Sequence, residues 1–159
     1  MTDVEMFRHT VATLAYRAAK TMRGAPAGFA EFRPGPTSNT PMRIVAHMAD
    51  LLAWSLTMLK GEAKWHSSDP QTWDAECGRF FVALESLDQA LESDEPIKGD
   101  LGKIFQGPVA DALTHTGQLA MLRRLSGAPM KGENYTRADI QIGRVGFDQT
   151  PADPRYEFD

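Results

Sequence analysis

Three residues of metal-binding type lie in two short stretches of the chain. Asp111 and His115 stand four residues apart in ADALTHTGQLAMLRRLSG, and His47 lies in the earlier stretch IVAHMADLLAW. Residues four apart on a helix lie one turn apart on the same face, so Asp111 and His115 could bind one ion from a single helix. Two imidazoles and one carboxylate suit Zn²⁺, Ni²⁺ or Fe²⁺ and leave coordination positions open for water or substrate.

The Asp111 and His115 pair falls on the face of its helix that the pattern predicts to be buried. At about 100° per residue, Asp111, His115 and Gln118 lie within about 60° of one another. Leu122 and Leu125 share this face, which indicates that it is turned to the core. Because an unpaired buried carboxylate is costly, we expect a hydrogen-bond network, a cation or a water-filled cavity around these polar groups.

His47 has the same unusual position on another predicted helix. It shares a stripe with Leu51 and Trp54, so we expect it to face the interior of the bundle and to complete the ligand set. Asp50 could receive the second N–H of His47 or lie solvated on the helix surface. Trp54 could form the wall of a pocket beside the metal or belong to the core, and Gln118 could support a ligand or line the same pocket.

Four helical segments must position these residues. Apolar residues recur at steps of three and four in each segment, and turn or capping residues separate the segments. Gly24 and Pro26 end the first helix, Thr40-Pro41 opens the second, Asp69-Pro70 opens the third and Gly107-Pro108 opens the fourth. Four helices of similar length predict an all-α, antiparallel four-helix bundle over residues 1–127.

The second helix and the last 32 residues suggest how the bundle is covered. The second helix is apolar on two sides, so it is either central or shared with a partner, and we expect a homodimer. Residues 128–159 contain frequent Gly and Pro and alternate only around Ile140 and Ile142. This pattern predicts an extended C-terminal arm that packs on the bundle or on a partner subunit.

Composition excludes several other classes of protein. The chain has 159 residues, of which 42% are hydrophobic and 24% charged, as expected for one globular domain. The formal charge is -4 and the basic residues are scattered, which argues against nucleic-acid binding. No apolar run approaches the roughly 20 residues of a membrane helix, and no targeting segment is visible, so we expect a cytoplasmic protein without membrane contact. Cys77 is the single cysteine, so any metal site must use His and carboxylate ligands.

The two stretches that contain His47 and His115 resemble helices of the DinB/YfiT-like metalloenzymes. In that family a histidine from an early helix and an HxxxH pair, followed by an RGQ-like stretch, bind a divalent metal within a four-helix bundle. His47 matches the first ligand, His115 matches the last, and Thr116-Gly117-Gln118 stands where the RGQ-like residues follow. Asp111 departs from the pattern, since most members have a histidine there; the topologically related mycothiol-dependent maleylpyruvate isomerases have a glutamate.

The resemblance implies a divalent-metal-dependent enzyme that acts on a small molecule. The metal is expected to be Zn²⁺ or Ni²⁺, held by His47, Asp111 and His115. The resemblance implies transfer of a low-molecular-weight thiol or thiol-dependent isomerisation. Hydrolysis is a third activity, less favoured than these two. The alternative hypothesis is a non-catalytic bundle that binds a small ligand or a partner, in which the same three polar residues satisfy one another without a metal.

Overall fold

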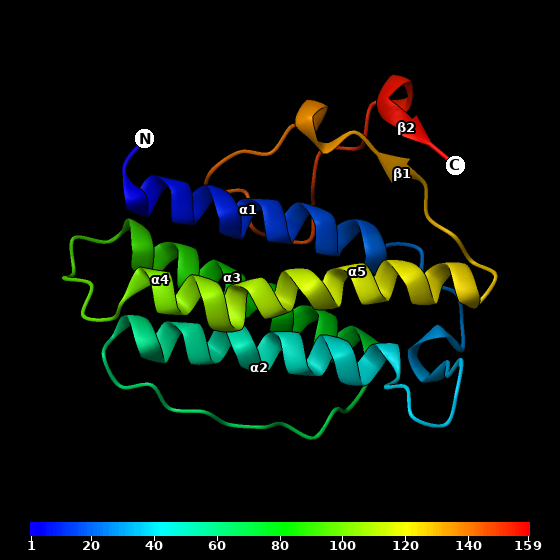
Figure 1. Ribbon diagram of the computed structural model, residues 1–159, viewed down its shortest axis with the longest axis horizontal. Coiled ribbons are helices and arrows are strands. Elements are labelled where there is room, and N and C mark those ends of the chain that lie inside the picture. The colour runs from blue at the N-terminus through cyan, green and yellow to red at the C-terminus, as the bar shows by residue number, and fades with distance from the viewer.

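The structure is a computed structural model that describes residues 1–159, and it is built almost entirely from helices (Figure 1). The main helices are α1 (Asp3–Met22), α2 (Pro41–Leu59), α3 (Trp73–Glu92) and a last helical segment that contains α4 (Leu101–Ile104) and α5 (Ala110–Leu125). The predicted all-α four-helix bundle is confirmed. None of these helices combines the length and the apolar character needed to cross a membrane.

The direction of the helices explains a long connection in the chain. In Figure 1, α1 and α5 run in one direction and α2 and α3 in the other, so α1 is antiparallel to α3 and α2 is antiparallel to α5. Side-chain contacts agree, since Arg8 near the start of α1 bonds Asp88 near the end of α3. Because α2 and α3 are parallel, residues 60–72 must return along the length of the bundle. We call residues 60–72 the strap.

Helix capping sets where α2 and α3 begin. Thr40 caps α2, with Pro41 at the first helical position, as the sequence predicts. The expected start of the third helix at Asp69-Pro70 is wrong by a few residues. Thr72 is the cap instead, and its side chain accepts a backbone N–H of the first turn of α3. Asp69-Pro70 therefore belongs to the strap.

The last helical segment begins earlier than its Gly and Pro residues predict. Asp100 caps α4 by accepting two backbone N–H groups, so Gly107-Pro108 lies inside the segment and does not open it. Proline has no N–H to donate within a helix. The chain forms a π-helical turn over Phe105–Val109 at this point, and the N–H of Ala110 bonds the carbonyl of Phe105, five residues back.

The core is a single apolar cluster to which all four helices contribute. Helix α2 is central in it, because Val45, Met48 and Leu52 are completely buried. The two apolar sides of α2, from which we expected a homodimer, are thus covered within one chain. The largest fully buried side chains of the other helices are Leu14, Phe80, Leu84, Leu87, Ile104 and Leu119.

Residues 128–159 lie over α1 (Figure 1) and are not extended throughout. Strands β1 (Gly132–Glu133) and β2 (Glu157–Phe158) form a short antiparallel pair. Glu133 is buried and accepts hydrogen bonds from the Tyr16 hydroxyl and the Lys20 ammonium, both at 2.7 Å. The arm is therefore fixed to α1 of its own bundle by a buried carboxylate.

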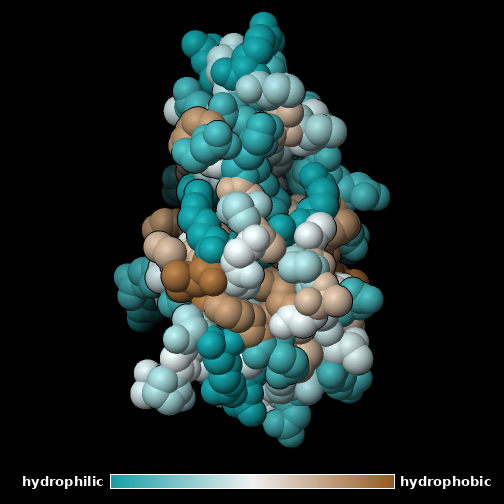
Figure 2. Space-filling model, turned by 90° about the vertical axis from the view of Figure 1, so that its right-hand side faces the viewer, coloured by the Kyte–Doolittle hydropathy of each residue, from teal (hydrophilic) through white to brown (hydrophobic).

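Figure 2 views the end of the bundle at which α1 and α5 end and α2 begins, and apolar residues gather across its middle between hydrophilic regions. The buried Arg123 closes the end of α1, because it donates to the carbonyls of Thr21, Arg23 and Gly24. Such terminal carbonyls have no partner within their own helix. From its position near the end of α5, Arg123 would be expected only to complement the dipole of its own helix. Its hydrogen bonds show a more specific role, because they cap the end of α1.

Candidate metal centre

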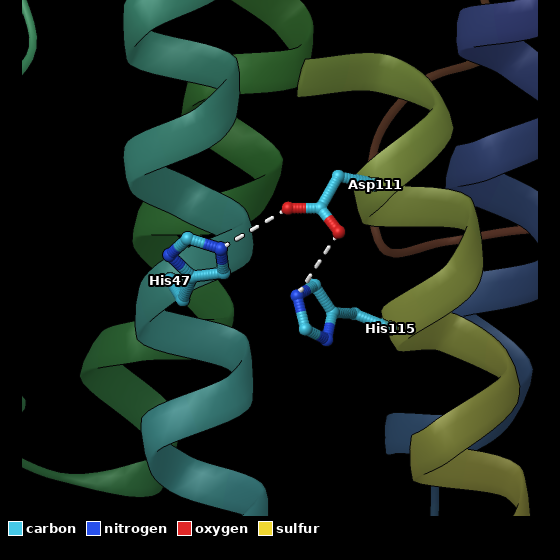
Figure 3. A group of neighbouring side chains, drawn as sticks. All are labelled: His47, Asp111 and His115. Carbon is cyan, nitrogen blue, oxygen red and sulfur yellow. Dashed lines mark hydrogen bonds and ion pairs between the residues drawn. The ribbon is translucent and has the colours of Figure 1, made fainter. Parts of the chain in front are cut away.

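His47 of α2 and Asp111 and His115 of α5 point toward one another between their two helices (Figure 3). Nε2 of His47 lies 3.3 Å from Oδ2 of Asp111, and Nε2 of His115 lies 3.4 Å from Oδ1 of the same carboxylate. One ligand atom from each residue lies within 4.8 Å of the other two. The three residues that the sequence singled out therefore form a cluster that could hold a metal ion.

The two contacts between imidazole and carboxylate, at 3.3 and 3.4 Å, have separations close to those between two ligands of one ion. Direct N–H···O hydrogen bonds have a donor to acceptor distance of about 2.9 to 3.0 Å, which is shorter than both imidazole to carboxylate contacts. Two ligand atoms that each lie about 2.1 Å from a tetrahedral Zn²⁺ are roughly 3.4 Å apart. The nitrogen and oxygen donors also match the types of ligand that Zn²⁺ and Ni²⁺ accept.

Gln118 determines which nitrogen of His115 faces the cluster. Nδ1 of His115 lies 2.8 Å from Oε1 of Gln118. An amide oxygen can only accept, so Nδ1 bears a proton in this contact, and Nε2 is the nitrogen that faces Asp111. A nitrogen lone pair that faces a carboxylate is stable only with a cation, which is either a proton on Nε2 or a metal ion between the two groups.

The cluster lies at the edge of the bundle and not in its core. The exposed fractions of the side chains are 39% for His47, 46% for Asp111 and 17% for His115, and Gln118 is exposed as well. The prediction that these residues lie within the bundle interior is therefore wrong. A small molecule can reach the three ligands directly from solvent.

The error lies in the face that was assigned to the core. Leu125 is 56% exposed, so it does not mark a buried face. The buried face of α5 contains Ala112, Thr116 and Leu119, whose mean direction is about 100° away from Asp111 around the helix axis. Leu122 lies on the same face as Asp111 and His115 but is buried.

The π-helical turn before α5 helps to direct Asp111 toward α2. A π-helical turn inserts one extra residue into a helix, which rotates the residues after it by about 100° relative to an uninterrupted helix. Phe105–Val109 ends two residues before Asp111. Pro108 thus contributes to the site through the backbone, which the sequence reasoning missed because it placed Gly107-Pro108 at a helix start.

Asp50 does not orient His47, and it is not solvated either. It is 5% exposed and accepts hydrogen bonds from the backbone N–H of Ser68 at 2.9 Å, from the Ser68 hydroxyl at 2.8 Å and from Arg79 of α3. Burial by itself would raise the pKa of Asp50, but these hydrogen bonds outweigh it and hold the pKa below its ordinary value. Asp50 therefore fastens the strap and α3 to α2.

Trp54 is connected to the site by Trp65, a residue that the sequence reasoning did not single out. The rings of Trp54 and of Trp65 in the strap meet edge-on, with 5.5 Å between their centroids. The centroid of the Trp65 ring lies 5.8 Å from that of the His47 ring. Trp65 follows no helical periodicity, so no pattern in the sequence places it near His47. The available signal was a large aromatic residue within an otherwise polar connection.

Cys77, the single cysteine, lies away from the cluster. It is partly buried and lines a cavity of about 410 Å³ with Met22, Trp73, Phe81 and Phe147. Burial raises the pKa of the Cys77 thiol to about 12. The thiol is thus protonated near neutral pH, and its role is packing.

Comparisons with known proteins identify no relative of this chain. The chain matches no protein-family model, no curated protein and no solved structure. The fold and the His47, Asp111 and His115 cluster, together with the resemblance of the two stretches that contain them, are therefore the basis for a functional proposal.

Proposed function

We propose that the chain is a divalent-metal-dependent enzyme of the DinB-like kind, with Zn²⁺ or Ni²⁺ held by His47, Asp111 and His115. One observation carries the proposal: ligand atoms from two helices converge within 4.8 Å. The contact between Nδ1 of His115 and Gln118 supports it, because it turns Nε2 of His115 toward Asp111, where that nitrogen could bind an ion. The bundle and the short resemblance to DinB-like helices favour the same interpretation.

The residues around the cluster perform separate tasks in this proposal. A divalent metal, when bound, lowers the pKa of a thiol or water in an open coordination position and so supplies a nucleophile near neutral pH. Gln118 holds the ring of His115 in the tautomer that can bind an ion. The partial exposure of His47 and Asp111 leaves room for a small molecule. We infer transfer of a low-molecular-weight thiol or thiol-dependent isomerisation, with hydrolysis as a third activity of the same site.

One observation favours a second candidate function. The two oxygens of Asp111 contact one imidazole each, and protonation of His115 would satisfy the cluster without any metal. The chain would then be a non-catalytic bundle that binds a small ligand or a partner. Metal binding distinguishes this metal-free network from the enzyme.

The deciding experiment is a metal titration of the chain after chelation and dialysis. We expect one Co²⁺, Zn²⁺ or Ni²⁺ per chain and a rise in Tm, since an ion that binds only the folded state stabilises it by about 2.7 kcal/mol at a concentration 100 times its Kd. His47→Ala and Asp111→Ala should abolish both effects, whereas His9→Ala and Asp148→Ala, outside the cluster, should retain them. Full stoichiometry in His47→Ala and Asp111→Ala would refute the site, and no binding to the natural chain would favour the metal-free network.

Three further predictions from the sequence belong to this proposal. They are a small-molecule substrate in place of nucleic acid, a homodimer and a cytoplasmic location. The homodimer has lost its original support, because the two apolar sides of α2 are covered within the chain. Light scattering that detects only a monomer would remove it.

A further inference from the structure

The strap is fixed to the bundle on both sides of Trp65. Before it, the backbone N–H of Lys64 donates to the Thr57 hydroxyl at 3.0 Å. After it, Ser68 donates twice to Asp50, which is itself buried. Three residues lie between these anchors, and Trp65 is the first of them. The position of Trp65 near the cluster is thus defined by bonds and not by a loose loop.

Trp65 belongs to a row of aromatic rings that leads into the cluster. It contacts Trp54 on one side and His47 on the other, and His47 contacts His115 edge-on at 5.0 Å. Trp65 nevertheless remains 47% exposed. If Trp65 only shielded His47 from solvent, the His47 side chain would be covered. The His47 side chain is instead 39% exposed.

Trp65 presents a partly exposed aromatic ring beside the cluster. Lys64, its neighbour in the chain, is paired with Glu62 at 2.7 Å, so it does not present a free cation. Aromatic side chains bind other flat groups by stacking and by burial of apolar surface. The ring of Trp65 and the cluster could therefore bind two ends of one small molecule.

We propose that Trp65 is a binding platform for a flat apolar group of the substrate, joined by a short link to the thiol or oxygen atom that reaches His47, Asp111 and His115. This inference rests on the proposed function and deepens it, because it names the substrate class: small aromatic compounds that bear a metal-binding sulfur or oxygen. Trp65 acts in selecting the substrate, and the three ligands act in binding its reactive atom.

The test uses the Co²⁺-loaded chain and two probes with the same metal-binding group. Benzohydroxamate bears an aromatic ring and acetohydroxamate a methyl group, and their Kd values can be read from the Co²⁺ absorption spectrum. We expect the natural chain to prefer benzohydroxamate by about fivefold or more. Trp65→Ala should bring this preference toward one without changing the affinity for Co²⁺ or acetohydroxamate.

Two control variants sharpen the test. Trp65→Phe keeps an aromatic ring and should retain most of the preference, and Val82→Ala, at an exposed position on α3, should retain all of it. An unchanged preference in Trp65→Ala would overturn the platform alone. A loss of Co²⁺ binding in Trp65→Ala would also overturn it, because Trp65 would then support His47 and not the substrate. A natural chain that takes up no Co²⁺ would refute the proposed function and the platform together.

Discussion

Two polar clusters, one around Asp50 and one around His47, begin one turn apart on α2 and differ in burial and in hydrogen bonding. Asp50 is 5% exposed, and it receives hydrogen bonds from Ser68 and Arg79 that satisfy both of its oxygens. His47 is 39% exposed and contacts Asp111 at 3.3 Å, which is long for a hydrogen bond. A fully satisfied buried cluster holds elements together, whereas a half-exposed cluster with long contacts retains the capacity to bind something else.

The largest expected difference between the clusters is in stability. Asp50→Ala would leave the Arg79 guanidinium with Glu76 as its one carboxylate partner and free the strap from α2. Removing one partner of a buried ion pair costs about 3 to 5 kcal/mol, and the value here should be near the lower limit because Arg79 is 33% exposed. Urea unfolding should show this loss. Asp111→Ala without metal should change the free energy of unfolding by less than about 0.5 kcal/mol, and equal losses in both variants would end the distinction.

Metal affinity should respond in the opposite way. Gln118→Ala removes the acceptor that fixes the His115 tautomer, and loss of such a supporting group lowers metal affinity by about 10- to 100-fold. Competition with a chelator of known affinity measures the change. Gln89→Ala, at an exposed position on α3, is the matched control and should leave the affinity unchanged. A Gln118→Ala variant that binds metal normally would mean that His115 needs no such support.

Acid should weaken the buried cluster in a defined direction. The folded-state pKa of Asp50 lies below its ordinary value near 3.8, so the carboxylate stabilises the fold above that pH, and this contribution is lost as the pH falls through the folded-state pKa. The difference in the free energy of unfolding between the natural chain and Asp50→Asn should therefore shrink below about pH 4. Urea unfolding between pH 7 and pH 3 checks this expectation. A difference that stays constant would show that Asp50 acts through shape alone.

Much of the bundle follows from local sequence features. The caps Thr40 and Pro41 and the apolar periodicity place α2 correctly, because capping and periodicity act within a few residues. Gly107-Pro108 was interpreted as a helix start because proline favours that position. The earlier cap Asp100 and a π-helical turn permit the helix to continue through it. Sequence alone does not reveal this choice between two local solutions.

The candidate site was predictable to the extent that residue type and spacing define it. His47, Asp111 and His115 have the chemistry of metal ligands, and a shared helix brings two of them together. Trp65 and the anchors Asp50 and Ser68 were not predictable, because they meet only when parallel α2 and α3 make the strap return along the bundle. Contacts that depend on the path of a connection leave no periodic trace in the sequence.

The smallest expected effect tests how far the open region extends along α5. Leu125 was assigned to the core together with the polar residues of the cluster, but its side chain is 56% exposed. Leu125→Ala should therefore change the free energy of unfolding by less than about 0.5 kcal/mol. Leu119→Ala, on the buried face of the same helix, is the reference and should cost about 2 to 5 kcal/mol because it leaves a cavity. A comparable loss at Leu125 would mean that this side of α5 is covered in solution, as contact with a second copy of the chain would require.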